Sequence, residues 1–211
     1  MGVFIVAVFA CFNDADQLLA LVIKPAGHLV FTSPGGAFSA VMAMTMVMAF
    51  IVTAPFLFYQ VWAFTAGALK PQERHFVYVF GPLSFFFFLL GVAFAFFVAI
   101  PMAYHFLMGF SSESLVPMIT VDNYLGFAGN MVVAFGVTFE LPLVLAFLAK
   151  IGIATPEFLR QKRRHAIMII LIVAAIATPP DVVSQLLLGI PLIVLYEVGI
   201  IFTAVFQKKT L

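Results

Sequence analysis

The sequence predicts an all-α integral membrane protein whose helices cross the bilayer several times. Of its 211 residues, 64% are hydrophobic and only 9% are charged, whereas about 25% of the residues of a soluble domain are charged. Apolar runs of about 20 residues, the length that one crossing needs, alternate with short polar segments. We therefore expect a single transmembrane domain over residues 1–211. The net charge of +1, without a basic stripe, argues against a nucleic-acid partner.

Five apolar runs after the first polar segment predict five crossings, and an earlier apolar run predicts part of another. The five runs cover residues 38–64, 76–104, 124–149, 166–178 and 182–205. Residues 1–12 are also apolar, but twelve helical residues cover about 18 Å of a hydrocarbon core of about 30 Å. We expect this run to be the outer part of a first crossing, which makes six in total. The thirteen residues of 166–178 are similarly short.

The basic residues predict the orientation of these helices. All but Lys24 of the ten Lys and Arg residues follow the second, fourth or sixth predicted crossing. Because cytoplasmic loops are enriched in Lys and Arg, these loops and both chain ends are expected in the cytoplasm.

Motifs for catalysis, metal binding and phosphate binding are missing from the sequence. It contains no His-Glu-x-x-His, no Gly-x-Ser-x-Gly and no glycine-rich phosphate loop. The four histidines are scattered, and Cys11 is the only cysteine. We therefore expect no enzyme, no cofactor and no metal site.

A few polar residues within or beside the apolar runs are candidates for function. An acid within an apolar run, such as Glu140, is costly in the membrane unless it is neutral, paired or facing water, so Glu140 is a candidate for function. The alternative is a structural role, in which the protonated acid donates a hydrogen bond to a backbone carbonyl. Thr178 and Gln185 flank a Pro-Pro-Asp turn, where polar groups cap helices or contact another transmembrane helix. From spacing alone, Glu73 beside Arg74 is best interpreted as a solvated surface turn.

The order and spacing of several motifs resemble those of TatC, the core subunit of the twin-arginine protein translocase. The resemblance runs from about Ser33 to Glu197. The motifs that carry it are Ser33-Pro34, Ala54-Pro55, Tyr59-Gln60-Val61-Trp62-Ala63-Phe64, Glu73-Arg74, Phe135 to Pro142, Thr178-Pro179-Pro180-Asp181, and Leu195-Tyr196-Glu197.

This resemblance implies a fold and a set of functional residues. The family has six transmembrane helices curved into a cup, with short fifth and sixth helices and a capping periplasmic loop. Glu73 corresponds to the acid that receives the arginine pair of a signal peptide, which reverses the interpretation from spacing, and Arg74 and Phe64 belong to the same binding site. Glu140 corresponds to an intramembrane acid on the concave side. Partner helices are expected at Thr178, Gln185 and Asp181.

The resemblance also implies partners and a location. TatC-like proteins bind twin-arginine signal peptides of folded cargo, recruit the single-span proteins TatA and TatB, and use the proton-motive force. We expect a homo-oligomer within such a complex, in the inner membrane of a prokaryote or in an organellar membrane. The family's N-terminal His-x-x-Glu-Leu-Arg type sequence is not found in this chain, which we expect to weaken signal-peptide binding. The alternatives are a proton- or ion-coupled solute transporter that uses Glu140 and a structural scaffold.

Overall fold

Among the residues that the structure describes, four helical segments are long and apolar enough to cross a membrane, and they confirm the predicted second, third, fourth and sixth crossings. The computed structural model describes residues 2–15, 19, 22–23, 29–30, 34–69, 74–109, 118–178 and 182–207. The four segments are Gly35–Gly67, Val77–Met108, Val121–Lys150 and Val182–Val205. The N-terminal apolar run forms the shorter helix α1, Gly2–Asn13, which packs against α3.

Helix α3, Pro34–Ala68, is the longest single helix among the described residues and contains no charged side chain. Proline suits its first position because the first amides of a helix have no partner within it. The hydroxyls of Thr45, Thr53 and Thr65 donate to the carbonyls four positions back, at 2.7–2.8 Å. These polar side chains are thereby satisfied within the helix, as the hydrocarbon core requires.

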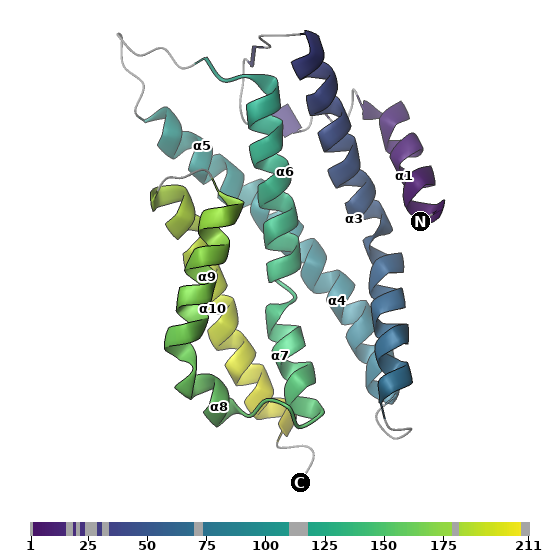
Figure 1. Ribbon diagram of the computed structural model, residues 1–211, viewed down its shortest axis with the longest axis vertical. Helices are drawn as coiled ribbons and strands as arrows, with labels where there is room; N and C mark the ends of the chain where they lie inside the picture. The colour runs from purple at the N-terminus through teal and green to yellow at the C-terminus, as the bar shows by residue number, and fades with distance from the viewer. Residues whose placement is uncertain are drawn as a thin grey trace.

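The third crossing is one bent helical unit of three parts (Figure 1). Helix α4, His75–Phe94, continues through a π-helical turn, Ala95–Ala99, into α5, Ile100–Met108. The turn is followed by Ile100 and then by Pro101, which has no amide N–H to donate to an α-helical hydrogen bond. Single π-turns of this kind bend helices. The sequence predicted the extent of this crossing but not its π-helical turn.

The fourth crossing is broken in the middle, at the position of Glu140. Helix α6, Val121–Thr138, ends there, and α7, Leu141–Lys150, begins with Pro142 in its first turn. Because proline has no N–H, the carbonyl of Thr138 lacks its usual α-helical donor. The Glu140 amide donates to the carbonyl of Val137 at 3.2 Å, a tighter turn that changes the direction of the chain.

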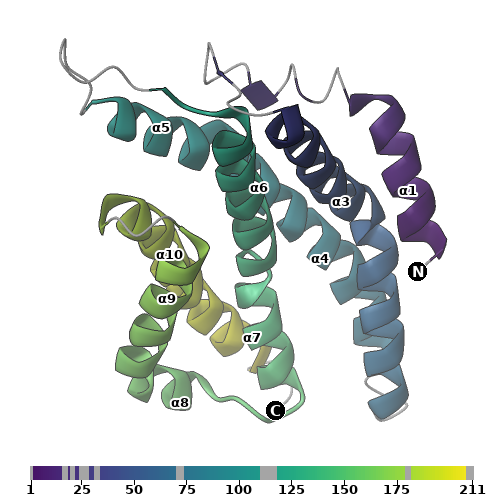
Figure 2. The ribbon, with the colours of Figure 1, turned by 45° about the horizontal axis from the view of Figure 1, so that its top comes forward.

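The fifth crossing is short, as expected. After the small helix α8, Pro156–Gln161, helix α9, Arg163–Ala177, has only 15 residues, which cover about 22 Å. Helix α10, Val182–Gln207, has 26 residues, so it is longer than the expected short sixth helix. It nevertheless runs obliquely beside α9, and the adjoining ends of α9 and α10 lie well below the tops of α3 and α6 (Figures 1 and 2). The α9–α10 pair therefore extends less far along the long axis of the molecule than α3 and α6, although α10 itself has 26 residues.

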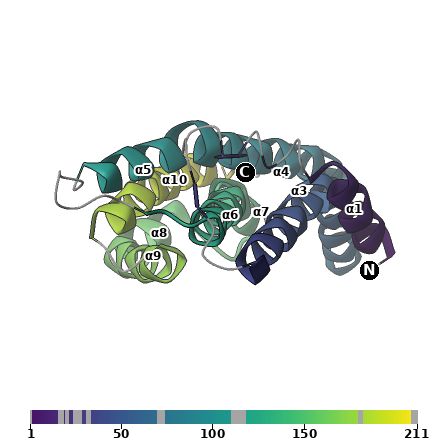
Figure 3. The ribbon, with the colours of Figure 1, turned by 90° about the horizontal axis from the view of Figure 1, so that it is seen from above.

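Helix α6 lies at the centre of the molecule and packs against α3, α4 and α9. Seen from above, the helices follow a curve with α1 at one end and α8 and α9 at the other (Figure 3). The approach of α4 to α6 depends on glycine, because a Cβ at Gly91 would lie 2.5 Å from the carbonyl oxygen of Phe135 and 2.9 Å from Cα of Gly136. Phe135 itself is fully buried in the core.

The segment before α3 is joined to the segment before α6 at the end of the molecule opposite the basic residues. The Val30 amide donates to the Ile119 carbonyl at 3.1 Å, and the Val121 amide donates back to Val30 at 2.9 Å. The buried hydroxyl of Tyr124 donates to the Val22 carbonyl at 3.1 Å. These bonds connect the segments that precede α3 and α6 at this end of the molecule.

The described basic residues lie at one end of the helices. Arg74 precedes α4, Lys150 ends α7, and the basic residues of α8 and α9 lie at the same lower end of Figure 1. This arrangement fits the predicted orientation, with that end in the cytoplasm.

Candidate functional site

The end of the α3–α4 hairpin on the side of the basic residues carries the first group of sequence-predicted site residues. The Phe64 side chain, on the last turns of α3, is 86% exposed, and Arg74 lies exposed at the start of α4. Glu73 lies outside the described residues. The structure thus brings Phe64 and Arg74 to the same end of one helical hairpin, on either side of the segment that contains Glu73.

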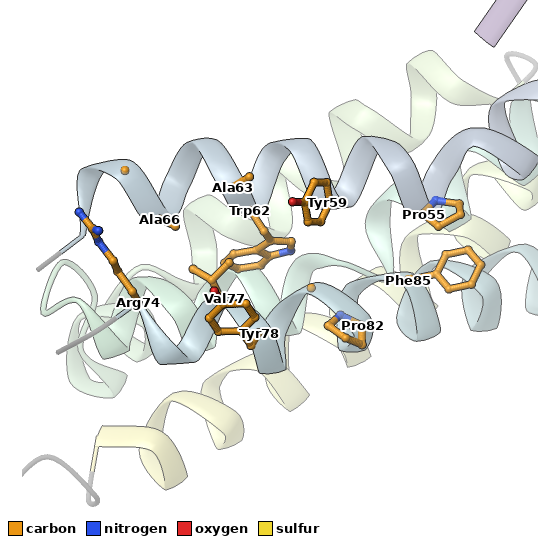
Figure 4. Close-up of a pocket in the computed structure, with 12 residues that line it drawn as sticks. Pro55, Tyr59, Trp62, Ala63, Ala66, Arg74, Val77, Tyr78, Pro82 and Phe85 are labelled. Atoms are coloured by element: carbon orange, nitrogen blue, oxygen red, sulfur yellow. The ribbon is translucent and has the colours of Figure 1, made fainter. Parts of the chain in front are cut away.

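A groove opens between α3 and α4 beside this surface (Figure 4). It has a volume of about 690 Å³. Aromatic side chains project along it, whereas small residues form its hollow parts. Its lining residues are Pro55, Tyr59, Trp62, Ala63, Ala66, Gly67, Arg74, Val77, Tyr78, Gly81, Pro82 and Phe85. Arg74 lies at one end, and Pro55 and Phe85 lie at the other (Figure 4).

Beneath the groove, Trp62 fixes α3 to α4 and α7. Its ring packs edge-on against Phe147 of α7, with the ring centroids 4.9 Å apart, and it also contacts Phe80 of α4. Its indole Nε1 donates to the hydroxyl of Ser84 at 2.9 Å, and both residues are buried. A tryptophan N–H in an apolar environment needs such a partner. This need explains why a polar residue, Ser84, lies directly before the run of phenylalanines in α4.

Glu140 lies at the break between α6 and α7 and faces a small apolar hollow of about 120 Å³. The walls of this hollow come from α3, α4 and α6: Phe50, Ala54, Leu57, Phe58, Val61, Phe88 and Val137. Its Oε1 atom is buried and has no hydrogen-bond partner among the described residues. The groups that face the carboxyl are the Ser84 hydroxyl and the backbone of Phe88.

This arrangement differs from the structural alternative that the sequence left open for Glu140. No hydrogen bond from the carboxyl to a backbone carbonyl is found within the described part of the chain. An acid with an unpartnered buried oxygen inside a membrane span is costly, and such residues commonly mark functional sites. Ser84 also connects this acid to the groove, because it accepts the hydrogen bond from Trp62.

The turn between α9 and α10 carries the predicted partner-docking residues. Thr178 is buried, and its hydroxyl donates to the Ala174 carbonyl at 2.8 Å. Gln185 donates through Nε2 to the Leu171 carbonyl at 3.0 Å, which joins α10 to α9. Asp181 lies outside the described residues. The Thr178 hydroxyl therefore bonds within the end of α9, whereas Gln185 joins α10 to α9 through its amide nitrogen and does not use its side-chain oxygen in that bond.

The C-terminal half of α10 is held by two further contacts. The buried Tyr196 hydroxyl donates to the Leu159 carbonyl of α8 at 2.8 Å. Glu197 pairs with Arg163 of α9 at 2.6 Å, and both side chains are partly exposed. This ion pair gives Glu197 a structural role between α10 and α9.

The groove and the Trp62–Ser84 hydrogen bond were missed by the sequence analysis. The relevant signal is the pattern of small residues on facing helices, Ala63, Ala66 and Gly67 on α3 and Gly81 on α4. This pattern predicts a groove only when the register between α3 and α4 is known. In the described part of the chain, no three His, Cys, Asp or Glu residues are arranged to hold a metal ion.

Comparisons with known proteins decide the family. The model of the family described as "Sec-independent protein translocase protein (TatC)" matches residues 1–191. This chain belongs to the TatC family. The TatC protein of Desulforapulum autotrophicum is 41% identical over 94% of this chain and 76% of its own length. The TatC protein of Escherichia coli K12 is 36% identical over 97% of this chain and 83% of its own length.

The fold agrees with that of solved TatC structures. A crystal structure described as "Twin Arginine Translocase Receptor- TatC" superposes with a TM-score of 0.87 and 33% identity, covering 97% of this chain and 93% of its own. A second crystal structure of the receptor, in detergent, superposes with a TM-score of 0.86. The predicted TatC architecture is therefore confirmed, and this chain is a multi-pass membrane protein of that family.

Proposed function

We propose that this TatC-family chain is the signal-peptide receptor and core component of a twin-arginine translocase, which exports folded proteins by using the proton-motive force. The observation that carries the proposal is the match to the twin-arginine translocase receptor over nearly the whole of both chains. In that role the protein binds and positions other chains, and we propose no catalytic site in it. Its location in this proposal is the inner membrane of a prokaryote.

Signal-peptide recognition is assigned to the cytoplasmic end of the α3–α4 hairpin. Glu73 receives the arginine pair, because a carboxylate can accept two parallel hydrogen bonds from a guanidinium, whereas a lysine supplies only a point charge. Phe64 offers an exposed apolar contact for the segment that follows the arginines. Arg74 belongs to the same surface, but its positive charge repels arginines, so it borders the site without contacting the pair.

Glu140 is assigned to contact with a transmembrane helix of a partner or of the inserted signal peptide. Its buried Oε1 atom and the apolar hollow in front of it favour an incoming polar side chain, which would satisfy the carboxyl group. The α9–α10 pair is the second docking surface. There Gln185, Thr178 and Asp181 receive the single-span helices of TatA and TatB, with Gln185 bonding through its side-chain oxygen. Several copies of this chain assemble within the complex.

Export in a bacterium that lacks its own TatC tests the proposal. The host would produce this chain together with the TatA and TatB proteins of the same genome, and a fluorescent protein with a twin-arginine signal would serve as folded cargo. We expect export that requires both arginines of the signal. The same test is made with a form that carries the N-terminal segment of another TatC protein. If this extended form is present in the membrane at normal abundance and no export occurs, the translocase function is wrong.

A further inference from the structure

The groove between α3 and α4 is a built cavity whose chemistry changes along its length. At its cytoplasmic end lies Arg74, and among the described lining residues it is the only charged one. The side chains of Tyr59 and Tyr78 flank the groove and are 70% and 79% exposed. With no described helix covering these tyrosines, they face the surroundings of the protein. Tyrosine is enriched at membrane interfaces because one end of its ring is apolar and the other polar.

The length of the groove matches half of a bilayer. On α4 the lining residues run from Arg74 to Phe85, eleven positions that span about 16 Å of helix. The hydrocarbon core is about 30 Å thick, so the groove extends from the cytoplasmic surface to about the midplane. Its volume of about 690 Å³ lies within the range of sites for small ligands, about 300–1,000 Å³.

The hollow of the groove results from residues without large side chains. Gly81 of α4 lies opposite Trp62, and a Cβ built on it would be 3.8 Å from Cδ1 of the indole, an ordinary contact distance. Gly67 of α3 has open space beside it, with nothing within 4 Å of an added Cβ. Larger side chains at Gly81 would therefore fill the groove without striking the backbone of another helix.

We propose that this groove binds an anionic phospholipid of the cytoplasmic leaflet, with its phosphate at Arg74 and an acyl chain along Trp62 and Gly81. A guanidinium at the mouth complements a phosphate, and basic pockets between transmembrane helices on the cytoplasmic side bind such headgroups. The arginine pair of a signal peptide has the wrong sign of charge for this mouth. A transmembrane helix would continue beyond the midplane, where the groove ends.

The single tryptophan makes the groove directly observable. Trp62 is the only tryptophan of the chain and lines the groove, so its fluorescence reports on what occupies the cavity. The purified full chain in mixed micelles would be titrated with phosphatidylglycerol or phosphatidylcholine whose acyl chains carry bromine atoms, which quench tryptophan at close range. We expect quenching at a roughly fivefold lower mole fraction of the anionic lipid, the preference that one interfacial arginine supplies.

Four variants separate headgroup recognition from general contact with lipid. Arg74→Gln is expected to remove the preference for the anionic lipid, and Arg74→Lys to retain part of it. Arg164→Gln, which changes an exposed cation at the same end of the molecule on α9, is the matched control and keeps the preference. Gly81→Leu is expected to reduce quenching by both lipids. Equal quenching by the two lipids in the unaltered chain, or a preference that survives Arg74→Gln, would overturn the proposal. Absence of quenching by either lipid would also overturn it, because a protein surface would then cover the groove.

Discussion

Replacement of Gly91 by alanine is expected to separate the two helices that position Glu140 and the groove. An added Cβ would lie 2.5 Å from the Phe135 carbonyl oxygen and 2.9 Å from Cα of Gly136, both of them backbone atoms of α6. Contacts between heavy atoms are most favourable at about 3.5–4.0 Å. A rotamer change cannot relieve this contact, so α4 and α6 have to move apart by about 1 Å.

The size of the effect is set by two opposing terms. Overpacking of a close-packed interior costs typically about 1–3 kcal/mol, and an immovable backbone contact belongs at the upper end of that range. Alanine is intrinsically more favourable than glycine within a helix by about 1 kcal/mol. We therefore expect Gly91→Ala to lower the free energy of unfolding by about 2 kcal/mol.

Unfolding in detergent micelles, followed by the fluorescence of Trp62, measures this difference. The matched control is Gly126→Ala on α6, where an added Cβ meets nothing within 4 Å. It is expected to leave the free energy of unfolding unchanged or to raise it by up to about 1 kcal/mol. If Gly91→Ala is as stable as the unaltered chain, the close approach of α4 and α6 is wrong.

Two further substitutions test individual hydrogen bonds by the same unfolding measurement. Ser84→Ala removes the acceptor of the Trp62 indole N–H and leaves a buried donor unpaired, so the free energy of unfolding is expected to fall by about 1–3 kcal/mol. Ser39→Ala, which removes an exposed hydroxyl on α3, is the control. Equal stability of these two variants would contradict the buried bond. Tyr196→Phe removes the donor to the Leu159 carbonyl and should cost about 0.5–1.5 kcal/mol; a loss as small as that of Tyr78→Phe, which removes an exposed hydroxyl, would argue against this contact.

The sequence predicted much of the fold because the membrane limits the possible structures. The backbone N–H and C=O groups of a span must be hydrogen-bonded within the protein, so long apolar runs form helices. Two of the predicted runs, 38–64 and 182–205, agreed in extent with α3 and α10. Breaks inside a span were harder to predict. A proline within a span bends its helix, but the sequence does not determine that a π-helical turn lies beside Pro101 and a full interruption beside Pro142.

The candidate sites were predictable only where one residue carries the signal. Glu140 was found because an acid within an apolar run is unusual. The groove was not found, because its shape depends on how Gly81 of α4 faces Trp62 of α3, and sequence spacing does not give that register. Ser84 was overlooked for the same reason, since its partner lies 22 positions earlier on another helix.

The central claim, that this protein recognises twin arginines through Glu73, is tested most directly by a double-mutant cycle in signal-peptide binding. The affinity of the unaltered chain and of Glu73→Gln would be measured for one peptide with the arginine pair and for the same peptide with two lysines. Hydrogen bonds between charged groups are worth about 1.5–3 kcal/mol. We expect the unaltered chain to prefer the arginine peptide by roughly tenfold or more and Glu73→Gln to bind both peptides alike. If Glu73→Gln retains the full preference for arginine, Glu73 is not the residue that recognises the pair.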